Sequence, residues 1–145
     1  MGKNMEKRIE IIKGVVDDWM NSEFSAPATD AMIDEFERKM DIVIPASYRD
    51  FLRLSNGARL FGGDCFLYSV NMDDTYRVNF DFSEGQVPKE LLIVGFYHSS
   101  HICYDKRYDR FYFYEYEDYD AVKDECSEFS DLCEVLDYII DIATG

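Results

Sequence analysis

The chain has 145 residues, of which 47% are hydrophobic and 16% aromatic, enough to bury the core of one folded domain spanning residues 1–145. No apolar run reaches the roughly 18 residues of a transmembrane helix, and charges interrupt the N-terminus too often for a signal peptide, so we expect a cytoplasmic protein. The net charge of −15 disfavours nucleic acids and anionic membranes as partners, because their phosphate groups would be repelled.

The negative charge is concentrated in the second part of the chain. Residues 1–60 hold 9 Lys and Arg against 11 Asp and Glu, a net charge of −2, whereas residues 61–145 hold 6 against 19, a net charge of −13. The last stretch, 115–145, holds 11 acids and a single base, Lys123. A high net charge can serve only to keep a protein soluble. Its concentration at one end favours a basic protein partner as well.

The first part of the chain shows helical periodicity. A first amphipathic helix is predicted from apolar residues at helical spacing, with Trp19 in its buried stripe: Met5, Ile9, Ile12, Val16, Trp19 and Met20. A second helix begins at a cap formed by Thr29 or Asp30 and carries an apolar stripe of Ile33, Phe36 and Met40.

A third helix is predicted over Ala46 to Ser55. The preceding Ile42 to Ile44 is extended because it leads into a proline, and Pro45 suits the first helical turn. Asn56-Gly57 is a strong stop, since both residues tolerate the left-handed conformation. The inner face of this helix is expected to carry Tyr48, Phe51, Leu52 and Ser55.

Beyond Gly57 the spacing of hydrophobic residues changes from a period of 3.6 to a period of 2, which predicts strands. Alternation over Thr75 to Phe82 predicts a strand that buries Tyr76, Val78, Phe80 and Phe82. The other predicted strands are Cys65 to Val70, Leu91 to Tyr97, and a hairpin of Ser100 to Tyr104 and Arg110 to Tyr116 joined by Asp105 to Asp109.

A last helix is predicted from Glu128 to Ala143, with Ser127 as its cap. Its inward residues are Phe129, Leu132, Val135, Leu136, Ile139 and Ile140. The order of elements predicts an α+β fold: N-terminal helices, an antiparallel-rich, mixed sheet of about five to six strands, and a C-terminal helix packed on that sheet.

One block, IDEFERKMDIVIPASYRDFLRLSNGARLF (Ile33 to Phe61), resembles the signature of the SUKH superfamily, the Smi/Knr-type domains. LLIVGFYHSSHICYD is similar to the family's strand-Gly-strand unit, and SEFSDLCEVLDYI to its terminal helix. Ala58 departs from the family pattern, which often has a second glycine there. The residues that carry the resemblance are Phe36, Glu37, Pro45, Tyr48, Phe51, Leu52, Asn56, Gly57 and Gly95.

The resemblance implies a scaffold without catalytic groups or cofactor. In bacteria many members are immunity proteins that bind and neutralise toxins, often nucleases, and in fungi members regulate cell-wall glucan synthesis. We therefore expect a non-enzymatic protein-binding domain. The leading function is immunity against a polymorphic toxin, and the alternative is a regulatory or scaffold role of the glucan-synthesis type. A small-ligand or enzymatic domain would require a deep polar pocket, which the sequence does not predict.

Two groups of residues could bind metal, and neither has a complete ligand set. His98, His101 and Cys103 lack a nearby fourth ligand for zinc, so Cys103 is better interpreted as a buried strand thiol. The acids after Tyr114 lack the order of a calcium loop. No metal is expected. The cysteines, Cys65, Cys103, Cys126 and Cys133, include no CxxC and are expected to be free thiols.

The stretch RFYFYEYEDYD, Arg110 to Asp120, is the candidate binding site. On a strand, Phe111 and Phe113 would face the core and the tyrosines a half-exposed face, before the chain leaves the sheet as an acidic loop. Taken alone, the pattern is better explained by a strand followed by a solvated loop, and only the family resemblance favours a binding surface. The functional hypothesis is a surface on which carboxylates replace phosphates in front of a basic toxin, formed by Tyr112, Tyr114, Glu115, Tyr116, Glu117, Asp118 and Asp120.

Overall fold

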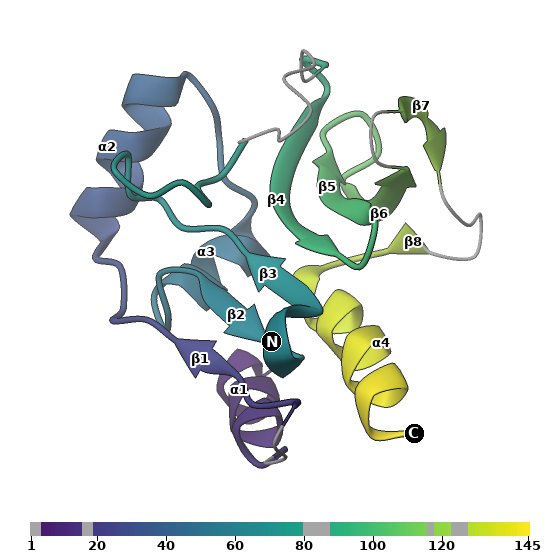
Figure 1. Ribbon diagram of the computed structural model, residues 1–145. Coiled ribbons are helices and arrows are strands. Elements are labelled where there is room, and N and C mark those ends of the chain that lie inside the picture. The colour runs from purple at the N-terminus through teal and green to yellow at the C-terminus, as the bar shows by residue number, and fades with distance from the viewer. Residues whose placement is uncertain (1–3, 16–18, 80–87, 116–117, 123–127) are drawn as a thin grey trace.

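The computed structural model describes residues 4–15, 19–79, 88–115, 118–122 and 128–145. These residues form an α+β fold in which helices pack on a curled antiparallel sheet (Figure 1). The helices are α1 (Met5–Lys13), α2 (Asp30–Met40), α3 (Ala46–Leu52) and α4 (Leu132–Thr144), with a short 3-10 turn at Phe61–Gly63. No helix in the described ranges is long and apolar enough to cross a membrane.

Seven strands follow one another across the sheet in chain order, and each pairs antiparallel with the next. The eighth, β8, pairs with β6. The strands are β1 (Glu23–Phe24), β2 (Ala58–Leu60), β3 (Cys65–Leu67), β4 (Leu91–Tyr97), β5 (Ser100–Asp105), β6 (Arg110–Glu115), β7 (Asp118–Val122) and β8 (Glu128–Phe129). The predicted α+β class is confirmed. The described residues hold more strands than expected, because β1, β2 and β8 are too short to show alternation and β7 lies where an acidic loop is predicted.

Helix ends follow local capping chemistry. Thr29 caps α2, and its hydroxyl accepts from the Met32 backbone N–H at 3.2 Å, as predicted. The last helix begins later than predicted, because Asp131 is its cap and accepts from the Glu134 N–H at 3.0 Å. The predicted cap, Ser127, lies outside the described residues. The third helix also ends at Leu52, short of the predicted Ser55.

Trp19 is not a core residue, which corrects the sequence prediction. Its side chain is 83% exposed, because α1 ends at Lys13 and the apolar stripe does not continue to Trp19. Gly14 closes the helix, and its N–H donates to the Glu10 carbonyl at 3.0 Å. Val16, expected in the same stripe, lies outside the described residues.

The predicted strand at Thr75 to Phe82 is also wrong over its described part, residues 75–79. Only an isolated bridge joins Ser69 to Arg77 there. The Asp74 carboxylate accepts from the Tyr76 N–H at 2.9 Å and from the Ser69 hydroxyl at 3.0 Å, and these local bonds replace a ladder. Val78 is buried as expected, but Tyr76 is exposed.

The core lies between the sheet and the helices. Phe111 and Phe113 of β6 are buried, as predicted, and Phe113 packs against Phe129 and against Tyr138 of α4 at ring-centroid distances of 5.4 and 5.6 Å. Helix α4 also contacts α1 and α3. All six residues predicted for the inward face of the last helix are buried, including Phe129, which belongs to β8.

Tyr48 connects α3 to the centre of the sheet. Its side chain is fully buried, and its hydroxyl lies within hydrogen-bond distance of the carbonyl oxygens of Tyr68 and Val94, at 2.9 Å from the latter. Val94 sits at a register shift in β4, between Ile93 and Gly95. Burial holds the pKa of this phenol well above its usual range, so it remains a hydrogen-bond donor. The hydroxyl thereby supplies a donor to the Tyr68 carbonyl, while the Val94 carbonyl also accepts from the Tyr68 N–H at 2.8 Å.

Glu37 connects the end of α2 to the start of α3. Its carboxylate accepts from the Ile44 N–H at 2.7 Å and from the Arg49 guanidinium at 3.3 Å. Arg49 also pairs with Asp34 of α2 at 2.6 Å. These bonds fix the extended segment that leads into Pro45, the N-cap residue of α3.

Two glycines are required by geometry. Gly57 has φ +91°, a conformation that side chains rarely adopt, and the preceding Asn56 amide oxygen accepts from the Val70 N–H at 2.9 Å. Gly95 lies where β4 passes so close to β3 that a Cβ would overlap the carbonyl oxygen of Phe66. Glycine inside a strand is typical of such a close approach between backbones.

Replacing Tyr48 by Phe is expected to lower the free energy of unfolding by about 1–3 kcal/mol, because a buried carbonyl loses its donor. Urea denaturation measures this difference. The matched control is Tyr108→Phe at an exposed ring, with an expected change within about 0.5 kcal/mol. Equal effects from the two variants would show that the Tyr48 hydroxyl does not hold the sheet.

Replacing Gly95 by Ala is expected to destabilise the fold by about 2–3 kcal/mol, because the new methyl group overlaps backbone that cannot rotate away. Thermal unfolding followed by circular dichroism measures the loss. Gly14→Ala, at a glycine with an ordinary helical φ of −75°, should change stability by less than about 1 kcal/mol. A Gly95→Ala variant as stable as that control would contradict the close packing of β3 and β4.

Candidate binding surface

The β5–β6 hairpin presents a tyrosine and charged side chains at its tip. Tyr108 is 59% exposed, and the Arg107 guanidinium lies over its ring at 5.1 Å. Asp109 has φ +52°, a left-handed conformation that aspartate tolerates and that reverses the chain before β6. The predicted hairpin is confirmed, although Asp105 belongs to β5 and not to the connection, and the exposed Tyr108 ring lies 6.4 Å from that of Tyr112.

Beneath the tip, Asp105 is a fully buried carboxylate that organises the hairpin. It accepts from the Arg107 backbone N–H at 2.9 Å, from that residue's guanidinium at 2.8 and 3.1 Å, and from the Tyr114 hydroxyl at 3.1 Å. Burial alone would raise the pKa of Asp105, but these donors outweigh it and hold the pKa below its ordinary value of 3.8. Asp105 is therefore an internal anchor and does not face a partner.

The tyrosines of β6 differ in exposure. Tyr112 is half-buried, and its ring meets those of Tyr108 and Tyr114 edge to face at 6.4 and 6.0 Å. Tyr114 is only 4% exposed, which corrects the expectation of a half-exposed side chain. Its hydroxyl points inward to Asp105, and burial raises the pKa of this phenol. Tyr112 can touch a partner, whereas Tyr114 supports the surface from below.

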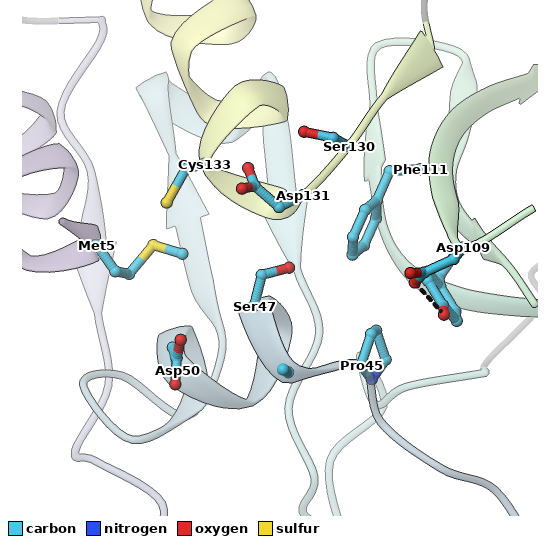
Figure 2. A pocket seen from close by; sticks show the side chains of 11 residues that line it. Met5, Pro45, Ser47, Asp50, Asp109, Phe111, Ser130, Asp131 and Cys133 are labelled. Carbon is cyan, nitrogen blue, oxygen red and sulfur yellow. Dashed lines mark hydrogen bonds between the residues drawn. The ribbon is translucent and has the colours of Figure 1, made fainter. Parts of the chain in front are cut away.

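Next to the hairpin lies a groove of about 290 Å³, bounded by the first turns of α3 and α4 (Figure 2). Its floor is apolar and includes the buried side chains of Met5 and Phe111. Three carboxylates from three separate elements line it: Asp50 of α3, Asp109 of the hairpin and Asp131 at the start of α4. The groove is thus apolar below and acidic around its rim.

Local hydrogen bonds hold the groove walls in place. The Tyr104 hydroxyl donates to Asp109 at 2.7 Å, drawn as a dashed line in Figure 2, and its ring packs on Phe111 at 5.3 Å. Burial, with the bond to Asp109, raises the pKa of Tyr104 to about 12. On the opposite side the Ser47 hydroxyl accepts from the Leu132 N–H at 3.0 Å, which joins the starts of α3 and α4.

The acidic residues predicted for the site lie in strands of the sheet wherever the structure describes them. Glu115 ends β6, and Asp118 and Asp120 lie in β7, which pairs back onto β6. The expected acidic loop over Glu115 to Asp120 is therefore corrected for its described part, while Tyr116 and Glu117 lie outside the described residues. The alternation of DYDAV is the period-two signal that could have identified this strand.

The groove was not predicted from the sequence. Its carboxylates are 59 residues apart between Asp50 and Asp109, and 22 apart between Asp109 and Asp131. The sequence indicates only the local role of two of these residues. Asp131 is a polar residue before an apolar helix, and Asp109 lies in a polar hairpin turn. Neither signal says that the two side chains meet across a hollow.

The histidines and cysteines considered as metal ligands are separated by the strand geometry. His98 is exposed in the turn before β5, whereas His101 and Cys103 are buried on one face of that strand. Within the ranges that the structure describes, no three His, Cys, Asp or Glu side chains are grouped as metal ligands. Cys65, Cys103 and Cys133 are free and buried, and Cys126 lies outside the described residues. Burial raises the pKa of the Cys65 thiol, which makes it a poor nucleophile.

Replacing Asp105 by Asn is expected to cost about 2–3 kcal/mol of unfolding free energy at pH 7, because the amide NH2 cannot accept the buried hydrogen bonds from Arg107 and the Tyr114 hydroxyl. The folded-state pKa is lowered, so the ionised carboxylate contributes stability above pH 3.8 and loses it as pH falls through the folded pKa. Urea denaturation of both proteins at pH 7 and pH 3 should show a large difference at pH 7 and a smaller one at pH 3. A difference that does not vary with pH would mean that the charge of Asp105 has no role.

Comparison with known families agrees with this structure. The sequence profile of the SMI1/KNR4 family (SUKH-1) matches residues 27–134, from the residues before α2 to the first turn of α4. A search of curated proteins finds no match. The matched region contains α2, α3, strands β2 to β8, and the residues by which the chain resembles the SUKH superfamily. The chain therefore belongs to the SMI1/KNR4 family (SUKH-1).

Proposed function

We propose that this protein is an immunity protein that neutralises a polymorphic toxin by stoichiometric binding of a basic surface on that toxin. The observation that carries the proposal is the segregation of charge, a net −13 in residues 61–145 against −2 in residues 1–60. The acidic part contains the hairpin, β7 and α4. Nucleases expose basic surfaces that bind phosphates, and a dense array of carboxylates is complementary to them.

The shape of the described surface favours binding over catalysis. Four hollows on it measure about 190–300 Å³, at or below the lower end of the roughly 300–1,000 Å³ usual for small-molecule sites. The Cys65 thiol is buried and protonated, so it offers no activated nucleophile. The family itself is generally non-enzymatic. We place the activity in protein–protein contact.

The proposed contact surface combines exposed rings with carboxylates. Tyr108 and Tyr112 supply ring surface, which binds at low entropic cost because tyrosine has few rotatable bonds. The acids that follow add long-range attraction and raise the rate of encounter. The residues proposed to contribute are Tyr112, Glu115, Tyr116, Glu117, Asp118 and Asp120, with Tyr114 as their buried support.

The alternative is a regulatory or scaffold role of the kind that fungal glucan-synthesis regulators have. Membership of the SMI1/KNR4 family supports this role as well as immunity, since the family includes both kinds of protein. The two functions differ in the partner: a single toxin in one case, and envelope-synthesis or signalling proteins in the other.

Affinity capture followed by an activity assay separates the two functions. The immobilised protein is exposed to lysate of the organism that encodes it at low salt, and proteins eluted by rising salt are identified by mass spectrometry. The proposal predicts a basic polypeptide whose toxic activity is abolished at a 1:1 ratio. Envelope or signalling proteins in its place would favour the alternative, and a captured toxin that stays active at 1:1 would contradict immunity.

Charge reversal tests the surface directly. The triple variant Glu117→Lys, Asp118→Lys and Asp120→Lys is expected to slow association with the captured toxin by about tenfold or more at low salt, because steering attraction is lost. At high salt the difference should shrink, since screening shortens the range of charge interactions. Stopped-flow or biosensor kinetics at two salt concentrations measure both effects.

The control carries the same change in net charge elsewhere: Glu10→Lys, Glu35→Lys and Asp64→Lys, at exposed positions of α1, α2 and the turn before β3. It should slow association less than the first variant. Equal slowing by both would mean that only net charge matters and that the 112–120 segment is not the contact.

A further inference from the structure

We propose that the groove between the hairpin, α3 and α4 is a receptor for a single arginine side chain of the partner protein. This inference rests on the proposed function, because it takes the partner to be a basic protein, and it adds which chemical group is recognised and where. The groove joins α3 to the acidic part of the chain and is separate from the 112–120 segment, since no described residue of that segment lines it.

Charge around the groove selects a cation. Asp50, Asp109 and Asp131 bring three negative charges, and no Lys or Arg is among the described residues that line it. The starts of α3 and α4 also point toward it, and each helix N-terminus acts as about half a positive charge. Arg53, which pairs with Asp50 at 3.1 Å and with Asp30 at 2.8 Å, offsets a further part of this charge, and the groove remains net negative. An anion would be repelled, and a guanidinium would be attracted.

The carboxylates are poised to accept new hydrogen bonds. Asp109 uses one oxygen for the Tyr104 hydroxyl, and Asp131 uses one for the Glu134 N–H. Within the described ranges neither carboxylate is in an ion pair, so the second oxygen of each remains for a partner's N–H groups. Asp50 pairs with Arg53, the residue that follows α3, at 3.1 Å, and this exposed pair is worth at most about 1 kcal/mol and is readily exchanged.

The apolar floor selects arginine among cations. Met5, Pro45 and Phe111, labelled in Figure 2, line the groove, and the Tyr104 ring packs on Phe111. A guanidinium is more weakly hydrated than an ammonium and stacks on rings, while its three-carbon stem can cover apolar surface. The groove volume, about 290 Å³, lies just below the range of about 300–1,000 Å³ for small-molecule sites, which suits one side chain.

The groove is also preorganised. Tyr104 fixes Asp109, the capping bond fixes Asp131, and Ser47 joins the two helix starts at 3.0 Å. Less side-chain freedom is therefore lost on binding than for acids on an unsupported surface, which favours affinity. These fixed positions also allow bidentate contacts to a guanidinium, whose N–H groups are held in a planar fork.

The test uses N-acetyl-arginine amide as a probe and its neutral isostere N-acetyl-citrulline amide as the reference. Both are titrated into the isotope-labelled full chain, followed by amide shifts in two-dimensional NMR. The expected result is saturable, millimolar binding of the arginine probe, with shifts concentrated at Ser47, Asp109, Ser130 and Asp131, and none from citrulline. Shifts spread evenly over exposed acids, or equal shifts from citrulline, would overturn the proposal.

A double variant that preserves the fold sharpens the test. Asp109→Asn and Asp131→Asn remove two charges but keep the hydrogen-bond acceptors for Tyr104 and the Glu134 N–H, and Asn is also a good helix cap. The arginine probe should bind at least fivefold more weakly to this variant. The matched control, Glu35→Gln with Asp64→Asn, has the same net charge and should bind as the unmodified protein does. Equal weakening in both variants would contradict the groove site.

An error in the proposed arginine site and an error in the proposed function would give different experimental results. A captured toxin that binds the double variant with unchanged affinity would overturn the groove while immunity stands. Specific arginine binding in the groove, together with a captured partner that is an envelope protein, would keep the groove and overturn immunity.

Discussion

The hydroxyl of Tyr48 is the contact on which the arrangement of this domain depends. It reaches from α3 to two backbone carbonyls of the sheet, one after β3 and one at the irregular point of β4. A helix of only seven residues has little stability of its own, so its position must come from such tertiary contacts. Glu37 and Arg49 fix the other side of the same helix to α2. Everything that α3 presents to solvent follows from this anchoring.

The candidate surfaces are built outward from α3. Ser47, one residue before Tyr48, accepts from the first N–H of α4, so the two helix starts are held together. Asp50 and Asp131 thereby face a common hollow. The third wall comes from the hairpin, whose shape depends on a separate buried centre at Asp105. Two independent buried polar networks thus converge on one external feature, and buried networks that are fully satisfied are rigid.

Much of the fold could be predicted where the signal is local. A few consecutive residues are enough to predict the hydrophobic period and caps of α2, the break at Pro45, and the apolar run of β4. The errors share a different cause. Trp19 has helical spacing but lies beyond the end of the helix at Gly14. Thr75–Asn79 has an alternating pattern, but the Asp74 carboxylate accepts a hydrogen bond from the Tyr76 N–H and bends the chain there. Short strands such as β8 exist only because β6 is already present to pair with.

The candidate site was less predictable than the fold because its members meet only in three dimensions. Tyr112 was found from composition, but the inward turn of Tyr114 depends on the partner carboxylate nine residues away in the hairpin. Asp50, Asp109 and Asp131 each have an unremarkable local role as surface pair, turn acceptor or helix cap. No local pattern marks them as a group.

Buried residues specify the fold and rim residues contact the solvent, so one scaffold can bind different partners. The signature residues Tyr48, Phe51 and Gly95 lie inside and specify the fold, and among the signature positions only Pro45 lines the groove. The rim acids make no core contact that another polar residue could not replace, since a cap at position 131 needs only an acceptor and a turn at 109 only a residue that tolerates positive φ. Substitutions at the rim acids would change the partner, whereas the free energy of folding would change little because it comes from the core. A fold of this kind can keep its stability and vary its specificity, which is the property that the immunity function proposed above requires.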